Sequence, residues 1–222
     1  MPRWSEPLLA LALAGSLVGC TGDDASGMAL PPATTGFTAD EAPVLVPGAP
    51  GESPTVLQPG ESGTMANPGA YVEADVTFVT DMVAHHAQAL RMAELAPERA
   101  QDQRVRGLAE RIAAGQGPEI ESMQAWLAAQ GLPAADAEAD HTAHQGMPGM
   151  ATPEQMTRLV ASSSEEFDRL FLEMMTSHHE GAIEMAGEAI GAQHPIVAGM
   201  VSDTVATQGA EINRMQQVLG EL

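Results

Sequence analysis

The sequence contains 222 residues, a length typical of one or two domains with a buried core. Thirty acidic residues against nine arginines give a formal charge of −21, which disfavours nucleic-acid binding because the chain would repel a phosphate backbone. The single cysteine excludes an intramolecular disulfide framework and a cysteine-based zinc finger. Fourteen methionines and seven histidines, the latter all beyond residue 84, are the unusual part of the composition.

Residues 1–19 have the features of a signal peptide. Arg3 precedes an apolar run, Leu8 to Val18, that is too short to span a bilayer. The run ends in Leu17-Val18-Gly19-Cys20, a pattern typical of a bacterial lipobox, in which the cysteine is lipidated and becomes the N-terminus. We expect Cys20 to anchor an extracytoplasmic lipoprotein to the cell envelope, with no other membrane contact. An ordinary signal peptide with an incidental cysteine is the alternative.

Residues 20–69 are expected to form a disordered tether between the lipid and the folded domain. Eight prolines and eight glycines occur within residues 21–69, which show little periodicity. Such a composition buries too little apolar surface to offset the entropy of ordering. The folded domain is therefore expected over residues 70–222.

An internal repeat is present in residues 70–222. The segment 78–93 matches the segment 171–186 at an offset of 93 residues, with adjacent histidines in both. The segment 116–124 matches the segment 208–216 at an offset of 92 residues. Because the two blocks recur in the same order, they indicate a duplicated helical hairpin.

Each half of the repeat is expected to contribute two helices to an all-α, four-helix bundle. The halves are residues 70–130 and 152–222, joined by a connection over residues 131–151. Pro97 is expected to end the first helix, and Gly115–Pro118 to kink the second. The helices are predicted over residues 71–95, 98–129, 164–190 and 195–219, with a short additional helix over residues 153–161.

Polar side chains occur on or beside the apolar stripes of the second and fourth helices. Gln116 and Glu119 interrupt the first of these stripes, and Gln208 and Glu211 interrupt the second at equivalent positions. A carboxylate directed at a core is costly unless a cation or a metal ion meets it. Both glutamates are therefore candidate metal ligands.

Paired histidines lie on the apolar stripes of the first and third helices, flanked by methionines at helical spacing. One histidine of each pair is expected to point inward and the other to lie at the edge, where it can face a neighbouring helix. Imidazole with thioether favours copper, and methionine favours Cu(I), whereas imidazole with carboxylate would also suit Zn, Fe or Mn. The alternative is that methionines fill core gaps while each histidine pairs with a glutamate. The predicted ligands on these helices are Met82, His85, His86, Met92, Met175, His178, His179 and Met185.

The connection between the halves carries a second candidate metal-binding segment. His141, His144, Met147 and Met150 follow one another at intervals of three in a Gly- and Pro-containing stretch with no core-packing pattern. A solvated loop with chance residues is the alternative. His194, next to Pro195, is expected to be a helix-terminal residue rather than a ligand.

These motifs resemble the DUF305 family. The resemblance is carried by Met-x2-His-His-x2-Ala-x2-Met-Ala at residues 82–93, its copy at 175–186, and the two Gln-x2-Glu-Ile-x2-Met blocks. It covers residues 71–222 and implies a ferritin-like four-helix bundle outside the cytoplasm that binds metal, above all copper, as CopM-type members do. Neither histidine pair has the Glu-x-x-His motif of ferritin-type di-iron centres, which argues against a ferroxidase.

The resulting hypothesis is a non-enzymatic lipoprotein that sequesters copper or passes it on, with a copper-handling protein or a homo-oligomer as the candidate partners. The first alternative is an iron- or manganese-dependent oxidase or reductase on the same scaffold. The second is a structural or interaction bundle in which the His and Glu groups form only a buried polar network. No catalytic residue is predicted, because no catalytic triad, phosphate-binding loop or nucleotide fingerprint is evident.

Overall fold

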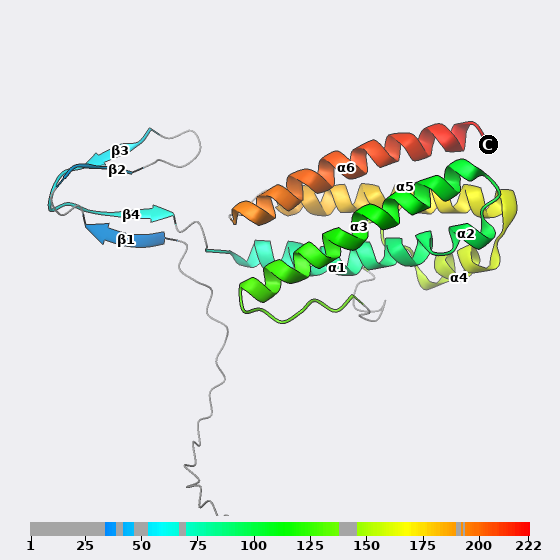
Figure 1. The fold of residues 1–222 in the computed structure, drawn as a ribbon, viewed down its shortest axis with the longest axis horizontal. Coiled ribbons are helices and arrows are strands. Elements are labelled where there is room, and N and C mark those ends of the chain that lie inside the picture. Colours follow the sequence, from blue (N-terminus) through cyan, green and yellow to red (C-terminus); the bar gives the residue numbers. More distant parts are fainter. Residues whose placement is uncertain are drawn as a thin grey trace, which may run out of the picture.

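The computed structural model describes residues 34–38, 42–46, 53–66, 70–137, 146–189, 192 and 194–222. Helices dominate the second of its two parts, beyond residue 70 (Figure 1). Their bounds are α1 (Glu73–Ala93), α2 (Ala96–Arg99), α3 (Gln103–Ala129), α4 (Pro153–Ala161), α5 (Ser164–Glu188) and α6 (Pro195–Gly220).

The four long helices form a bundle of two hairpins. α1 packs along α3, α5 packs along α6, and the two hairpins meet mainly through α1 and α5 (Figure 1). The short α4 lies against α5. The predicted four-helix bundle with duplicated hairpins is therefore confirmed, and the segment expected to form a short helix over residues 153–161 has those bounds in the structure.

The second predicted helix is divided in two. α2 ends at Arg99, and α3 begins after Asp102, whose side chain accepts a hydrogen bond from the Arg104 backbone N–H. The carboxylate of Asp168 on α5 accepts the backbone N–H groups of Gln101 and Asp102. These contacts satisfy the polar groups of the break, so a new helix starts there. α3 then continues through Pro118 as one helix.

Part of the segment expected to be a disordered tether forms short strands. β1 (Thr34–Thr38) pairs antiparallel with β4 (Ser62–Ala66), and β2 (Val44–Val46) pairs antiparallel with β3 (Thr55–Leu57). The β-branched Thr and Val residues favour these extended segments. Leu45 and Val56 remain exposed, so the β2–β3 ladder buries little apolar surface.

Residues 1–33, which include the predicted signal peptide and Cys20, lie outside the described residues. Within the described ranges, no helix combines the length and the apolar character needed to cross a membrane.

The interior of the bundle consists of two apolar clusters with a polar layer between them. Cluster 1 includes Met92, Met175 and Met215, and cluster 2 includes Met82 and Met185. Along each of the four long helices, buried polar side chains separate the residues of one cluster from those of the other. The polar layer therefore crosses the whole bundle at the level of the paired histidines.

Candidate metal centre

The polar layer, called here the histidine layer, consists of six nearly inaccessible side chains. At most 3% of any of these residues is exposed. As expected, the inner histidine of each pair points into the bundle and the outer one faces a neighbouring helix, α3 or α6. The outer histidines are nevertheless as buried as the inner ones, because those helices cover them. The members of the layer are His85, His86, Gln116, His178, His179 and Gln208.

The outer histidine of each pair is held by a glutamate from the partner helix of its own hairpin. His86 Nε2 lies 2.7 Å from Glu119 Oε2, and His179 Nε2 lies 2.7 Å from Glu211 Oε2. Because a carboxylate only accepts, Nε2 carries the proton in both rings and donates it. In the neutral form of such a ring the lone pair is on Nδ1, and both Nδ1 atoms are buried with no partner among the described residues.

The inner histidines meet across the interface between α1 and α5. The ring centroids of His85 and His178 lie 3.8 Å apart, with an interplanar angle of 38°. His85 Nε2 donates to the Pro148 carbonyl oxygen at 3.1 Å, which leaves its buried Nδ1 as the lone-pair atom. Neither ring nitrogen of His178 has a hydrogen-bond partner among the described residues.

The inner imidazoles are neutral at physiological pH. Burial, reinforced by the neighbouring His86, lowers the pKa of His85 from 6.5 to about 3, although the hydrogen bond to Pro148 opposes this shift. Burial also lowers the pKa of His178 well below its ordinary value, with further lowering from His85 and His179. Because only a neutral imidazole has a free lone pair, both rings are in the protonation state that can bind a metal ion.

The segment 146–151 covers the inner histidines from one side. A Cβ atom on Gly181 of α5 would lie 2.1 Å from the Pro148 carbonyl oxygen, so the loop and the helix backbone are in direct contact there. A Cβ atom on Gly149, which has φ of +73°, would lie 2.5 Å from the Ser177 carbonyl oxygen of α5. The side-chain amide of Gln88 accepts the Ala151 N–H at 2.7 Å and donates to its carbonyl at 2.9 Å. These contacts place Pro148 over His85.

Two amides of the layer have no hydrogen-bond partner among the described residues. Gln116 on α3 and Gln208 on α6 are buried, and both polar atoms of each side chain are unpaired there. Their positions are equivalent in the repeat. Buried polar groups are normally satisfied, so each half brings an unpaired amide and unpaired imidazole nitrogens to the same layer.

The four predicted methionine ligands lie in the apolar clusters on the two sides of the layer. Met92 and Met175 belong to cluster 1, and Met82 and Met185 belong to cluster 2. Their packing agrees with the gap-filling alternative and also places thioethers on both sides of the imidazoles. In the described residues, no three His, Cys, Asp or Glu side chains are grouped so that they could hold one ion together.

The connection is described only in part. His141 and His144 lie outside the described residues, whereas Met147 and Met150 are half-buried. Met147 packs against cluster 2, which corrects the expectation that nothing in this segment packs on the core. His194 is the N-cap of α6, as expected, and its Nδ1 accepts hydrogen bonds from Trp126 Nε1 and the Ile196 N–H.

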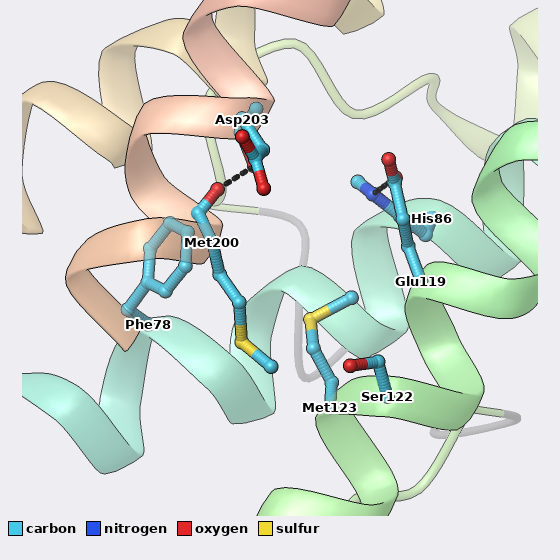
Figure 2. A pocket seen from close by; sticks show the side chains of 8 residues that line it. Phe78, His86, Glu119, Ser122, Met123, Met200 and Asp203 are labelled. Carbon is cyan, nitrogen blue, oxygen red and sulfur yellow. Dashed lines mark hydrogen bonds and ion pairs between the residues drawn. The ribbon is translucent and has the colours of Figure 1, made fainter. Parts of the chain in front are cut away.

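A pocket of about 110 Å³ between α1, α3 and α6 reaches the layer at the His86–Glu119 pair. Figure 2 shows the side chains of Met123, from α3, and Met200, from α6, extending into this pocket. Asp203 and Ser122 lie on its exposed side. Sequence analysis did not identify this pocket, because its residues come from two halves of the repeat and follow ordinary helical spacing.

Comparison with known proteins identifies the relatives of this chain. The family model described as "Domain of unknown function (DUF305)" matches residues 75–219. A DUF305 fragment from Deinococcus radiodurans is 36% identical, with a TM-score of 0.62 over 68% of this chain and 99% of that one. A DUF305 protein from Streptomyces coelicolor, described as secreted, is 33% identical, with a TM-score of 0.60 over 67% of this chain and 93% of that one. No curated protein matches the chain in sequence.

The chain is also similar to CopM, whose structures include metal-bound forms. The Cu(I)-bound form of CopM is 27% identical, with a TM-score of 0.55 over 66% of this chain and 96% of that one. Cu(II)-bound and silver-bound forms of CopM match equally well in identity and fold. With a family model that spans the whole bundle, and with solved DUF305 relatives of the same fold, the chain belongs to the DUF305 family.

Proposed function

We propose that this protein binds copper in the histidine layer and holds it outside the cytoplasm, for sequestration or for delivery to a partner. The observation that carries the proposal is the state of His85, His86 and His179. Each donates Nε2–H to a fixed oxygen acceptor and has a buried Nδ1 atom with no hydrogen-bond partner among the described residues. Metal-binding histidines have this arrangement, because the second hydrogen bond sets the tautomer and orients the ring.

The unpaired atoms favour a ligand over a purely structural network. Leaving a buried polar atom without a partner costs about 1–3 kcal/mol. The layer contains several such atoms, including both nitrogens of His178. A structural network would satisfy its members, whereas a bound cation would compensate the imidazole lone pairs directly.

The donor chemistry favours copper among the candidate metals. Imidazole is a good ligand for copper, and the thioethers on both sides of the layer select Cu(I) over harder ions. Cu(I) also accepts two or three ligands, so it does not require three His, Cys, Asp or Glu donors around one point. The similarity to CopM, which has been crystallised with Cu(I), Cu(II) and silver, supports the same metal.

The proposed location depends on the N-terminal sequence. A lipid on Cys20 would hold the protein at the outer side of a membrane, with residues 21–69 between the anchor and the bundle. The charge of −21 would attract cations to such a tethered domain. Replacement of Cys20 by Ser is expected to release the protein from the membrane fraction and to abolish incorporation of labelled palmitate. A variant that stays in the membrane fraction and still incorporates palmitate would contradict the proposal that Cys20 is the anchor.

The metal assignment is tested with the full-length protein and two matched variants. The first, His85→Leu with His178→Leu, removes the two inner imidazoles and keeps the volume of the layer apolar. The second replaces His141 and His144 by Ser and Met147 and Met150 by Leu, which removes these donors and keeps the apolar volume that packs on cluster 2. Copper content is measured after competition with a Cu(I) chelator, and X-ray absorption reports imidazole and sulfur ligands. Circular dichroism verifies that both variants keep their helices.

The expected result is loss of the chelator-resistant copper in the layer variant only. Loss in the connection variant alone would place the site outside the layer and overturn the assignment. Elemental analysis of protein from metal-replete cells separates the alternatives, because iron or manganese would favour an oxidase or reductase, and the absence of any metal would favour a structural module.

A further inference from the structure

The pocket beside His86 has features that the copper-binding layer alone does not require. Met123 and Met200 line it from two helices, and Figure 2 shows both thioethers extending into the same space. The His86–Glu119 pair forms its inner wall, and Glu119 is 38% exposed, whereas His86 is buried. The pocket therefore joins solvent to the layer at one hydrogen-bonded His–Glu pair.

We propose that this pocket is the port through which Cu(I) reaches the histidine layer, with the thioethers of Met123 and Met200 as its first ligands. This inference rests on the proposed function and adds a second metal-binding site to it. Two thioethers are soft, neutral ligands that bind Cu(I) and exchange it readily with imidazole. Glu119 and Asp203 make the mouth of the pocket anionic, which raises the local concentration of a cation.

The equivalent place in the other half of the repeat is lined by buried apolar side chains. There the positions of Met200 and Thr204 are occupied by Leu108 and Ile112, which are at most 2% exposed and belong to cluster 1. Met215 corresponds to Met123, and both are buried: Met215 fully in cluster 1, and Met123, 3% exposed, in cluster 2. The packing difference therefore lies at Met200 and Thr204, which line the port where the other half has Leu108 and Ile112.

The charge at the two places also differs in sign. Asp203 and Ser122 at the port correspond to the exposed Arg111 and Arg214 in the other half. Two arginines repel an approaching cation, whereas the port presents carboxylates. Glu211 is 21% exposed, so it is more covered than Glu119. The side-chain packing, the surface charge and the exposure of the glutamate therefore all favour entry of Cu(I) beside His86.

The first test measures how fast the full-length protein takes up Cu(I) under anaerobic conditions. Met123→Leu with Met200→Leu removes both thioethers and keeps similar apolar volume. Ser122→Arg with Asp203→Arg gives the port the charges of the equivalent place in the other half. Either double variant is expected to slow uptake about tenfold or more. Met215→Leu, a buried thioether away from the port, is the matched control and is expected to keep the wild-type rate.

The second test observes the thioethers directly. With methionine labelled as ¹³C-methyl, the Met123 and Met200 resonances are expected to shift when Cu(I) is added to the His85→Leu, His178→Leu variant, while the Met215 resonance stays in place. The same titration is carried out on the wild-type protein, where the imidazole resonances report filling of the layer.

The outcomes separate the two proposals. Unchanged uptake in the methionine double variant, or port resonances that do not shift, would overturn the port. Shifted port resonances without any change at the imidazoles would support the port and contradict the histidine layer as the final site. If Cu(I) moves neither set of resonances, both proposals are wrong.

Discussion

The two halves of the repeat are alike inside the bundle and different at its surface. In each half an outer histidine donates to a glutamate at 2.7 Å, and a glutamine with no hydrogen-bond partner among the described residues lies in the same layer. At the surface, however, one half has a pocket beside its histidine, and the other has buried apolar side chains at the equivalent positions. Duplication therefore gave a symmetric set of buried polar side chains with different surroundings.

The loop over the layer adds a second asymmetry. At the position of Gln88, which binds the backbone of Ala151, the second half has Gly181, against which Pro148 packs. As a result His85 has a hydrogen-bond partner and His178 has none among the described residues. Equivalent residues in a repeat can thus have different roles once a connection that belongs to neither half packs on them.

The largest expected effect is that of removing the inner histidines. His85→Leu with His178→Leu should abolish tight copper binding and raise the stability of the metal-free protein, because it removes buried groups without partners, at about 1–3 kcal/mol for each. The single variant at His178 should gain more stability than that at His85, which loses its bond to Pro148. Chemical denaturation measures both. A loss of stability in both single variants would indicate a structural network instead.

The next effect is the pH dependence of the metal-free protein. In the unfolded protein both inner imidazoles bind protons as the pH falls below about 6.5. In the folded protein His85 stays neutral until about pH 3. The unfolded state holds more protons in this window, so the free energy of unfolding falls with decreasing pH, with a slope that approaches about 1.4 kcal/mol per pH unit for each such histidine well below pH 6.5. Denaturation curves between pH 7 and pH 5 should show this fall steepening, and the double Leu variant should show a flatter dependence.

A smaller effect is expected where the loop contacts α5. Gly181→Ala introduces a Cβ atom 2.1 Å from the Pro148 carbonyl oxygen, so the loop must move, at a cost of about 1–3 kcal/mol. Gly187→Ala is the matched control, because a Cβ atom there meets nothing within 4 Å. Thermal unfolding should separate the two variants, and equal melting temperatures would show that the loop does not restrain the layer.

The smallest effect is expected from the glutamates that orient the outer histidines. Glu119→Gln and Glu211→Gln weaken the hydrogen bond to Nε2, and each should lower copper affinity about tenfold. The Glu211 side chain is 21% exposed, against 38% for Glu119. Water can therefore replace less of the weakened hydrogen bond at Glu211, and Glu211→Gln should lose more copper affinity than Glu119→Gln. Chelator competition measures both affinities. A larger loss of copper affinity in Glu119→Gln than in Glu211→Gln would contradict the expectation that the more buried glutamate matters more.

Much of the fold was predictable because the repeat and the helical periodicity are local properties of the sequence. The bundle, the short helix at Pro153–Ala161 and the N-cap at His194 agree with the pattern. The break before Gln103 was not predicted, because it depends on Asp168, a residue of α5 distant in sequence. The strands between residues 34 and 66 were also missed, since their pairing joins segments separated by Pro- and Gly-rich stretches.

By itself, the sequence determined which donors this protein has and that both halves supply them at equivalent positions. Spacing along a helix specifies a face, so the paired histidines and their glutamates could be assigned to the interior. Only the tertiary structure decided that His85 meets Pro148, that His178 has no partner among the described residues, and that Met123 and Met200 share a pocket. Those features depend on how side chains from different helices and a loop pack together, which periodicity along one helix does not specify.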